Sequence, residues 1–197
     1  MKCLKKISLV ALSVLAMGSI YKVRHTTFQE PMVKKTDIKV EGVHQIVESE
    51  AAHLSESERG QIKSVVLHLS REYHIDPLLI LSVVHVESHF KPSAASNRGA
   101  LGLMQIKPVV VRELSKRQNV SLEHQYLLKD NVFNLHVGVR YLSFLINKYH
   151  GDVNKALMAY NAGPTTVSLL YKNRPAPTGG YQGRVLKTYQ RYAMLVL

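Results

Sequence analysis

One glutamate, Glu87, has a position in the sequence that suits acid–base chemistry. Glu87 follows the mostly apolar segment 79–86 and precedes a segment that contains glycines. Partial burial raises the pKa of a carboxyl group, and the negative end of a helix dipole at this C-terminus acts in the same direction. A carboxyl that is still protonated near neutral pH can act as a general acid. Taken alone, however, a glutamate at a helix end also fits an exposed surface residue.

The spacing of the acidic residues favours chemistry with a single carboxylate. No Asp or Glu occurs between Glu87 and Glu113, whereas ordinary glycosidases use a pair. Glu113, Glu123, Asp130 and Asp152 have the positions of helix-surface or helix-capping residues. A second carboxylate that is distant in sequence stays open as an alternative.

A metal site is the competing interpretation of the same segment. His85 and His89 are four residues apart, a spacing at which two histidines on a helix can share a zinc ion. Glu87 lies two residues from each, about 200° around a helix, so it cannot join them. A zinc protease would also place its glutamate directly after the first histidine. We therefore expect neither a metal nor another cofactor.

The elements around these residues show the signals of helices. Ser55 and Glu58 form a capping box, Asp76 precedes Pro77 as a helix start, and Gly151 is a stop signal. No Val/Ile/Thr-rich alternating segment of strand length is present, and residues 91–107 have the composition of a loop. We expect an all-α domain with helices at about residues 56–74, 77–90, 108–116, 131–150, 153–160 and 181–195.

The N-terminus resembles a secretory signal. Lys2, Lys5 and Lys6 precede the apolar run 7–20, and Ala16-Met17-Gly18 offers a cleavage site. The run fits a cleaved signal peptide and an uncut membrane anchor equally, and a buried N-terminal helix is a weaker alternative. The sequence therefore divides into a signal peptide or membrane anchor (1–21), a linker (22–40) and one domain (41–197).

Positive charge gathers at the two ends of the chain. The formal net charge is +12, with 8 Lys and Arg against 2 acidic residues in 1–40, and 14 against 4 in 98–197. Such a field attracts polyanions, including nucleic acid, anionic lipid and acidic wall polymers, without choosing among them. The single cysteine, Cys3, cannot form an internal disulfide and says nothing about the compartment.

Four ordered blocks within residues 76–192 resemble one family. They are Glu87-Ser88, the Gly102-Leu-Met104-Gln105 segment, Ala159-Tyr160-Asn161, and a final helix with Tyr181 and Tyr189. Their order and spacing resemble the soluble lytic transglycosylase family, although Thr178-Gly179-Gly180 stands where the family often has an acid and a threonine before the tyrosine. The resemblance implies a lysozyme-like helical fold with a substrate groove.

The resemblance also implies a reaction. Glu87 would protonate the oxygen between N-acetylmuramic acid and N-acetylglucosamine in peptidoglycan, and then act as the base. The substrate's 2-acetamido group would stabilise the cation, and the muramic 6-hydroxyl would close a 1,6-anhydro ring. The enzyme would work in the periplasm or at the periplasmic face of the membrane, with peptidoglycan strands as its partner and membrane association through the N-terminus. We expect no nucleic-acid partner; protein partners are unknown.

Six further residues are expected to bind substrate. Gln105 can donate hydrogen bonds to N-acetyl and hydroxyl groups and accept hydrogen bonds from them. Met104 is expected to lie beneath Gln105 and to pack in the floor of the groove. Ser88 should hydrogen-bond near Glu87 or near the sugar, or else cap its helix. Tyr160 can pack in the groove and contact the Glu87 carboxyl.

Two interpretations stay open for each of the last two residues of this set. Asn161 binds substrate or caps its helix ahead of Gly163, and Tyr181 lines the groove or belongs to the core. Two alternatives to the lytic transglycosylase function also stay open. One is a hydrolytic muramidase on the same fold, and the other is a non-catalytic peptidoglycan-binding assembly protein.

Overall fold

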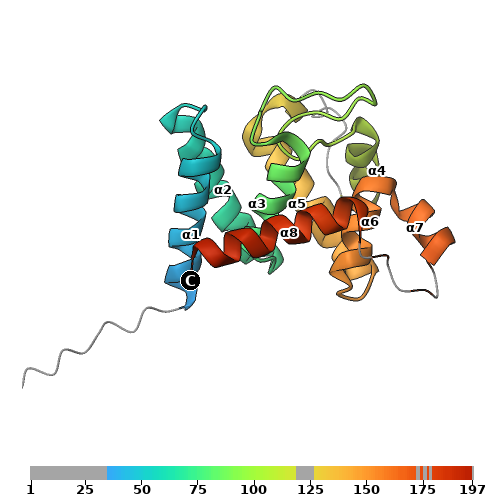
Figure 1. Ribbon diagram of the computed structural model, residues 1–197. Coiled ribbons are helices and arrows are strands. Elements are labelled where there is room, and N and C mark those ends of the chain that lie inside the picture. The colour runs from blue at the N-terminus through green and yellow to red at the C-terminus, as the bar shows by residue number, and fades with distance from the viewer. Residues whose placement is uncertain (1–34, 119–126, 172–173, 175–176, 178, 197) are drawn as a thin grey trace, which may run out of the picture. The chain divides into compact units, whose positions relative to one another are not determined.

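The computed structural model describes residues 35–118, 127–171, 174, 177 and 179–196 (Figure 1). Within these residues every regular element is a helix, which confirms the all-α prediction. The helices are α1 (Lys35–Glu50), α2 (Glu56–Tyr73), α3 (Pro77–Ser88), α4 (Pro108–Gln118), α5 (Asn131–Lys148), α6 (Val153–Ala162), α7 (Pro164–Tyr171) and α8 (Gly180–Leu195). The predicted signal or anchor segment, 1–21, lies outside the described residues, as do residues 22–34.

Helix α1 corrects the predicted boundary between linker and domain. The helix begins at Lys35, so the last part of the predicted linker, residues 35–40, is helical. The linker was predicted from a lack of periodicity, and the apolar face of α1 starts only with Val43, Ile46 and Val47, which are fully buried. This i, i+3, i+4 spacing packs the helix against α2, α3 and α8.

Local capping signals set the starts of α2 and α3 as predicted. The Ser55 hydroxyl accepts from the Glu58 backbone amide at 3.3 Å, and the Glu58 carboxylate accepts from the Ser55 amide at 3.0 Å. Asp76 accepts from the Leu78 amide at 3.0 Å, and Pro77 occupies the first turn of α3. Each side chain satisfies an amide that the helix itself leaves unpaired.

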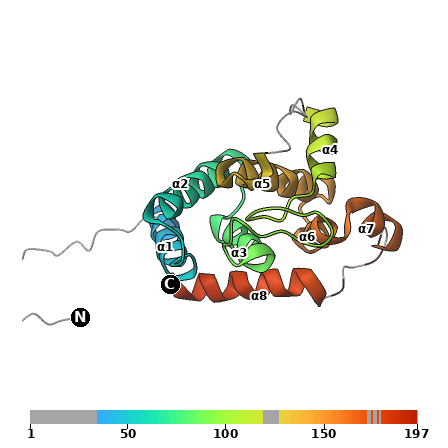
Figure 2. The ribbon, with the colours of Figure 1, turned by 90° about the horizontal axis from the view of Figure 1, so that it is seen from above.

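Helix α3 is the centre of the packing (Figure 2). All of its residues from Pro77 to Val84 are buried, because α8 runs along one side of it and α1 and α2 also pack against it. Figures 1 and 2 both show α1 and α2 at one end of α8 and α6 and α7 at the other. The C-terminal end of α3, which carries Glu87, is therefore held from several directions.

Helix α7 was not predicted from the sequence. It follows α6 after Gly163, whose backbone φ is 88°, and begins at Pro164. Only Val167 of this short helix is buried, whereas Leu169 and Leu170 are exposed. Its apolar residues therefore do not follow the spacing of a helix with one buried face.

The segment between α3 and α4 is a loop, as predicted. Two isolated bridges, Ala95 with Leu101 and Leu101 with Ile106, fold it back on itself. Gly99 and Gly102 both adopt positive φ, at 74° and 75°, a conformation that glycine reaches without strain. Among the described residues, no helix has the length and apolar character needed to cross a membrane.

Candidate active site

Glu87 lies in the last turn of α3 and is partly buried. Burial raises its pKa to about 6, while a hydrogen bond from Tyr181 and the charge of Arg184 act in the opposite direction. The helix ends directly after it, where His89 and Phe90 both take left-handed backbone conformations. The sequence predicted both the raised pKa and burial as a cause.

Tyr181, in the first turn of α8, contacts this carboxyl. Its hydroxyl donates to Glu87 Oε1 at 2.7 Å, and its side chain is only 7% exposed. Burial and the charge of Glu87 raise the pKa of the Tyr181 phenol well above its usual value, so the hydroxyl keeps its proton and stays a donor. Arg184 lies over the ring of Tyr181, 5.8 Å from its centroid.

The Tyr160 hydroxyl, which was expected to contact the Glu87 carboxyl, has another hydrogen-bond partner. The Tyr160 hydroxyl donates instead to the Met104 carbonyl at 2.9 Å, and its ring packs at 5.5 Å from that of Tyr141. Two tyrosines from two helices meet near the site, and the tertiary arrangement turns the one from α8 towards the carboxyl. Tyr160 therefore fixes the loop, while Tyr181 contacts Glu87.

The segment from Leu101 to Gln105 is tied to three helices. Ser88 Oγ in α3 donates to the Leu103 carbonyl at 2.8 Å, and the Val84 carbonyl lies 3.1 Å from the same hydroxyl. Asn134 in α5 accepts from the Met104 amide at 2.8 Å and donates to the carbonyls of Leu101 and Leu128, also at 2.8 Å. Tyr160 in α6 adds the bond to Met104.

Besides Tyr181, two side chains of the predicted binding set are buried. Met104 is 0% exposed, and Ser88 is 5% exposed. Met104 lies against Gly138 of α5, where an added Cβ would collide with its sulfur. Met104 thus forms part of the packing beneath the loop, and neither side chain lines the pocket described below.

Gln105 adopts a left-handed backbone conformation, with φ of 48°. Its Nε2 donates to the carbonyls of Ala94 and Gly102 at 3.0 Å each, which uses both amide protons. The side-chain oxygen is then the group that Gln105 can present to a ligand, as an acceptor. The loop therefore orients this amide in advance.

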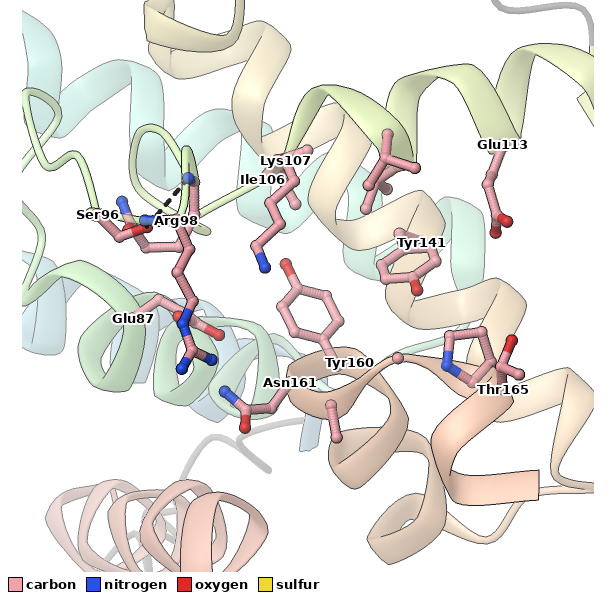
Figure 3. Close-up of a pocket in the computed structure, with 17 residues that line it drawn as sticks. Glu87, Ser96, Arg98, Ile106, Lys107, Glu113, Tyr141, Tyr160, Asn161 and Thr165 are labelled. Carbon is pink, nitrogen blue, oxygen red and sulfur yellow. Dashed lines mark hydrogen bonds between the residues drawn. The ribbon is translucent and has the colours of Figure 1, made fainter. Parts of the chain in front are cut away.

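A pocket of about 400 Å³ opens at Glu87 (Figure 3). Its walls come from the end of α3, the loop 96–107, α4, α5 and the junction of α6 with α7. The lining residues are Glu87, Ser96, Arg98, Ala100, Gln105, Ile106, Lys107, Val109, Val110, Glu113, Tyr141, Tyr160, Asn161, Ala162, Gly163, Pro164 and Thr165. Figure 3 shows Glu87 and Glu113 at opposite ends.

Asn161 lies in this pocket and is exposed. The cap of α6 is made by Gly163, whose amide bonds to the Ala159 carbonyl at 2.9 Å. The structure therefore assigns the capping position to Gly163 and leaves the Asn161 amide open to a ligand. Among the described residues, no group of three or more His, Cys, Asp and Glu could hold a metal ion.

The sequence reasoning missed four polar residues near the site. Arg98, Lys107 and Tyr141 line the pocket, and Asn134 anchors the loop. Asn134 carried a signal that could have found it, because it shares the inward face of its helix with Val137 and Tyr141. A polar residue on a buried face needs hydrogen-bond partners, and loop carbonyls are the nearest source. Arg98 and Lys107 had no comparable signal in the sequence.

Comparison with known proteins gives consistent matches. Residues 64–178 match the model of the transglycosylase SLT domain. A protein named transglycosylase from Enterobacteria phage PRD1 is 35% identical over 118 residues, which are 60% of this chain and 39% of that protein. Membrane-bound lytic murein transglycosylase E of Buchnera aphidicola is 37% identical over 101 residues, 49% of this chain and 44% of that protein. The chain thus spans less than half the length of these relatives.

A solved structure shares the fold. The X-ray structure of an inactive mutant of the lytic transglycosylase Slt from Pseudomonas aeruginosa matches with a TM-score of 0.61 and 24% identity. The match covers 68% of this chain and 24% of that one. This likeness confirms the lysozyme-like helical fold that the sequence resemblance implied.

Proposed function

Because the chain belongs to the transglycosylase SLT domain family, we propose that it is a lytic transglycosylase that cleaves the glycan strands of peptidoglycan. The observation that carries the proposal is a partly buried carboxyl in a pocket, with its pKa raised to about 6. An acid with this pKa is protonated often enough near neutral pH to donate a proton, and its conjugate base is strong enough to take one back.

In the proposed reaction Glu87 serves twice. It first donates its proton to the oxygen between N-acetylmuramic acid and N-acetylglucosamine, and the C1–O bond of muramic acid breaks. The substrate's acetamido oxygen stabilises the positive charge at C1. The Glu87 carboxylate then takes the proton of the muramic 6-hydroxyl while that oxygen bonds to C1, which closes the 1,6-anhydro ring without consuming water.

Tyr181 supports the first step in this proposal. Its hydroxyl, held as a donor 2.7 Å from Oε1, stabilises the carboxylate that exists between the two proton transfers. Gln105 would accept a hydrogen bond from an N–H or O–H of the sugar, and Asn161 and Tyr160 would line the groove beside it. Ser88 and Met104 would act through the backbone of the loop instead of touching the sugar.

The decisive experiment compares the products of two proteins. The full chain and its Glu87→Gln variant digest purified peptidoglycan, and mass spectrometry identifies the released fragments. We expect fragments lighter by one water than hydrolysis products from the wild type and none from the variant. Equal anhydro products from both proteins would disprove the role of Glu87.

One observation favours a hydrolytic muramidase as the second candidate. Glu113 lines the same pocket, and a distant second carboxylate can activate water. In that case the fragments would have full hydrolytic mass, and Glu113→Gln would abolish them. In the lytic mechanism Glu113→Gln keeps the anhydro products. A non-catalytic peptidoglycan-binding protein would bind strands and release no fragments.

We further propose that the chain acts outside the cytoplasm. The basic and apolar N-terminal run has the layout of an export signal, and one relative is named as membrane-bound. The domain would then begin with α1 at Lys35, after an export segment and a shorter linker. N-terminal sequencing of the protein recovered from the membrane and soluble fractions would distinguish a cleaved signal from an anchor.

A further inference from the structure

Two basic side chains line the pocket at the end where Glu87 lies. Arg98 and Lys107 extend from the loop into the space beside Glu87 and Tyr160 (Figure 3). Neither takes part in the ion pairs found among the described residues. Elsewhere, by contrast, Arg59 and Lys63 share Glu48 and Arg191 pairs with Glu50.

The loop fixes the backbone from which both cations extend. The Ser96 hydroxyl accepts from the amides of Arg98 and Ala100, at 3.3 and 3.0 Å. Lys107 directly follows Ile106, whose amide and carbonyl both bond to Leu101, at 2.9 and 3.0 Å. The backbone from which both side chains extend is thus ordered before any ligand arrives, so binding does not have to order the loop.

The charges in the pocket are separated along its length. The cations lie at the Glu87 end, while Glu113 lies at the other end with Tyr141 and Thr165 (Figure 3). Arg98 is exposed and Lys107 is half-buried, and two cations that line one concave pocket attract an anion more strongly than a single cation on an open surface does. The end of the pocket next to the reacting bond is therefore suited to a negatively charged ligand.

We infer that Arg98 and Lys107 form a carboxylate subsite that selects strands with a negatively charged substituent on the muramic acid being cleaved. This inference rests on the proposed function, because it places C1 of muramic acid at Glu87. The lactyl substituent sits on C3 of the same ring, so any pocket that holds the ring must also accommodate that substituent. Its carboxylate is free in strands without peptide, and in peptide-bearing strands the stem supplies carboxylates of its own.

The test uses three classes of glycan strand. The first has free lactyl carboxylates, the second is identical except that these are converted to neutral methyl amides, and the third carries peptide stems. The full chain is compared with the double variant Arg98→Gln/Lys107→Gln. A matched control, Arg112→Gln/Lys116→Gln, removes the same charge from exposed positions of α4 outside the pocket.

We expect the double variant to lose roughly 10- to 100-fold in kcat/KM on charged strands, the size of a lost charge-assisted hydrogen bond. On methyl-amide strands the wild type should fall to the level of the variant, and the control should behave as the wild type throughout. A loss confined to peptide-bearing strands would identify the stem carboxylates as the ligand, whereas a loss on stem-free acidic strands would identify the lactyl group. A loss that is equal on charged and neutral strands would overturn the inference.

Failure of the inference can be separated from failure of the proposed function. The Glu87→Gln background keeps both cations and should hold strands uncleaved, so binding of the same three strand classes can be measured without turnover. If the wild type releases no fragments, the proposed function fails, and the binding series still tests the subsite. If the wild type cleaves but binds and cleaves acidic and neutral strands equally, the subsite fails and the function stands.

Discussion

Replacing Tyr181 by phenylalanine is expected to raise the pKa of Glu87 and move the pH profile of cleavage to higher pH. The Tyr181 hydroxyl donates to the carboxylate at 2.7 Å, and a hydrogen bond to a charged group contributes about 1.5 to 3 kcal/mol. At 1.36 kcal/mol per unit, its loss raises the pKa by about 1 to 2 units from the value of about 6. Because Glu87 keeps some contact with solvent, the lower end of this range is expected.

The direction follows from the protonation state that cleavage requires. Glu87 must be protonated to donate to the glycosidic oxygen, so kcat/KM is high at low pH and falls as the pH rises through the Glu87 pKa. In the variant this fall should occur about 1 to 2 units higher. The low-pH plateau should also be lower, because a carboxyl with a higher pKa is a weaker acid towards the leaving group.

The assay measures kcat/KM on purified strands over a range of pH for the wild type and two variants. Tyr189→Phe is the matched control, because it removes a hydroxyl from the same helix whose bond goes to Asp76, at 3.2 Å, and not to Glu87. Its profile should coincide with that of the wild type. A Tyr181→Phe profile that falls at the wild-type pH, or at a lower one, would refute the electrostatic reasoning.

Three further predictions concern stability, each measured by urea unfolding. Burial raises the pKa of Glu87 from 4.5 to about 6, so the folded state loses stability as Glu87 ionises between these two pH values. Glu87→Gln should therefore raise the free energy of unfolding by up to about 2 kcal/mol above pH 6. Below about pH 4.5 the substitution should have no such effect. Asn134→Ala removes three hydrogen bonds at 2.8 Å, two of them buried, and should cost at least about 3 kcal/mol; a cost under 1 kcal/mol would contradict its anchoring role. Gly138→Ala drives a methyl group into Met104 and should cost about 1 to 3 kcal/mol, whereas Gly60→Ala, with open space around it, should stabilise by about 0.5 to 1 kcal/mol.

The parts of the fold that could be predicted depend on local interactions. The starts of α2, α3, α5 and α6 each follow a side chain that caps amides within three residues of itself. Glu87 was predictable for a similar reason, since an apolar helix determines the burial of the residue at its end. Helix α7 was missed because most of its apolar residues face solvent, and α1 was missed because its buried apolar residues begin only at Val43.

The pairing of side chains across the site could not be predicted in the same way. Tyr160 and Tyr181 are both tyrosines in helices that meet near Glu87, and each carries a hydroxyl able to reach a carboxyl. Tyr181 is separated from Glu87 by 94 positions, and its contact depends on how α8 lies along α3. The choice between the two tyrosines is a property of helix packing, which no local pattern encodes.

The loop segment from Leu101 to Gln105 shows why residues that do not touch a ligand belong to the site. Its backbone is bonded to Ser88 of α3, Asn134 of α5 and Tyr160 of α6, and its own bonds in turn fix the Gln105 amide. Ser88 directly follows Glu87 in the chain, so a single helix end positions both the acid and the loop opposite it. The distance between Glu87 and the Gln105 oxygen is therefore set by buried hydrogen bonds, and substitutions at Ser88 or Asn134 should change substrate positioning without altering a group that the substrate contacts.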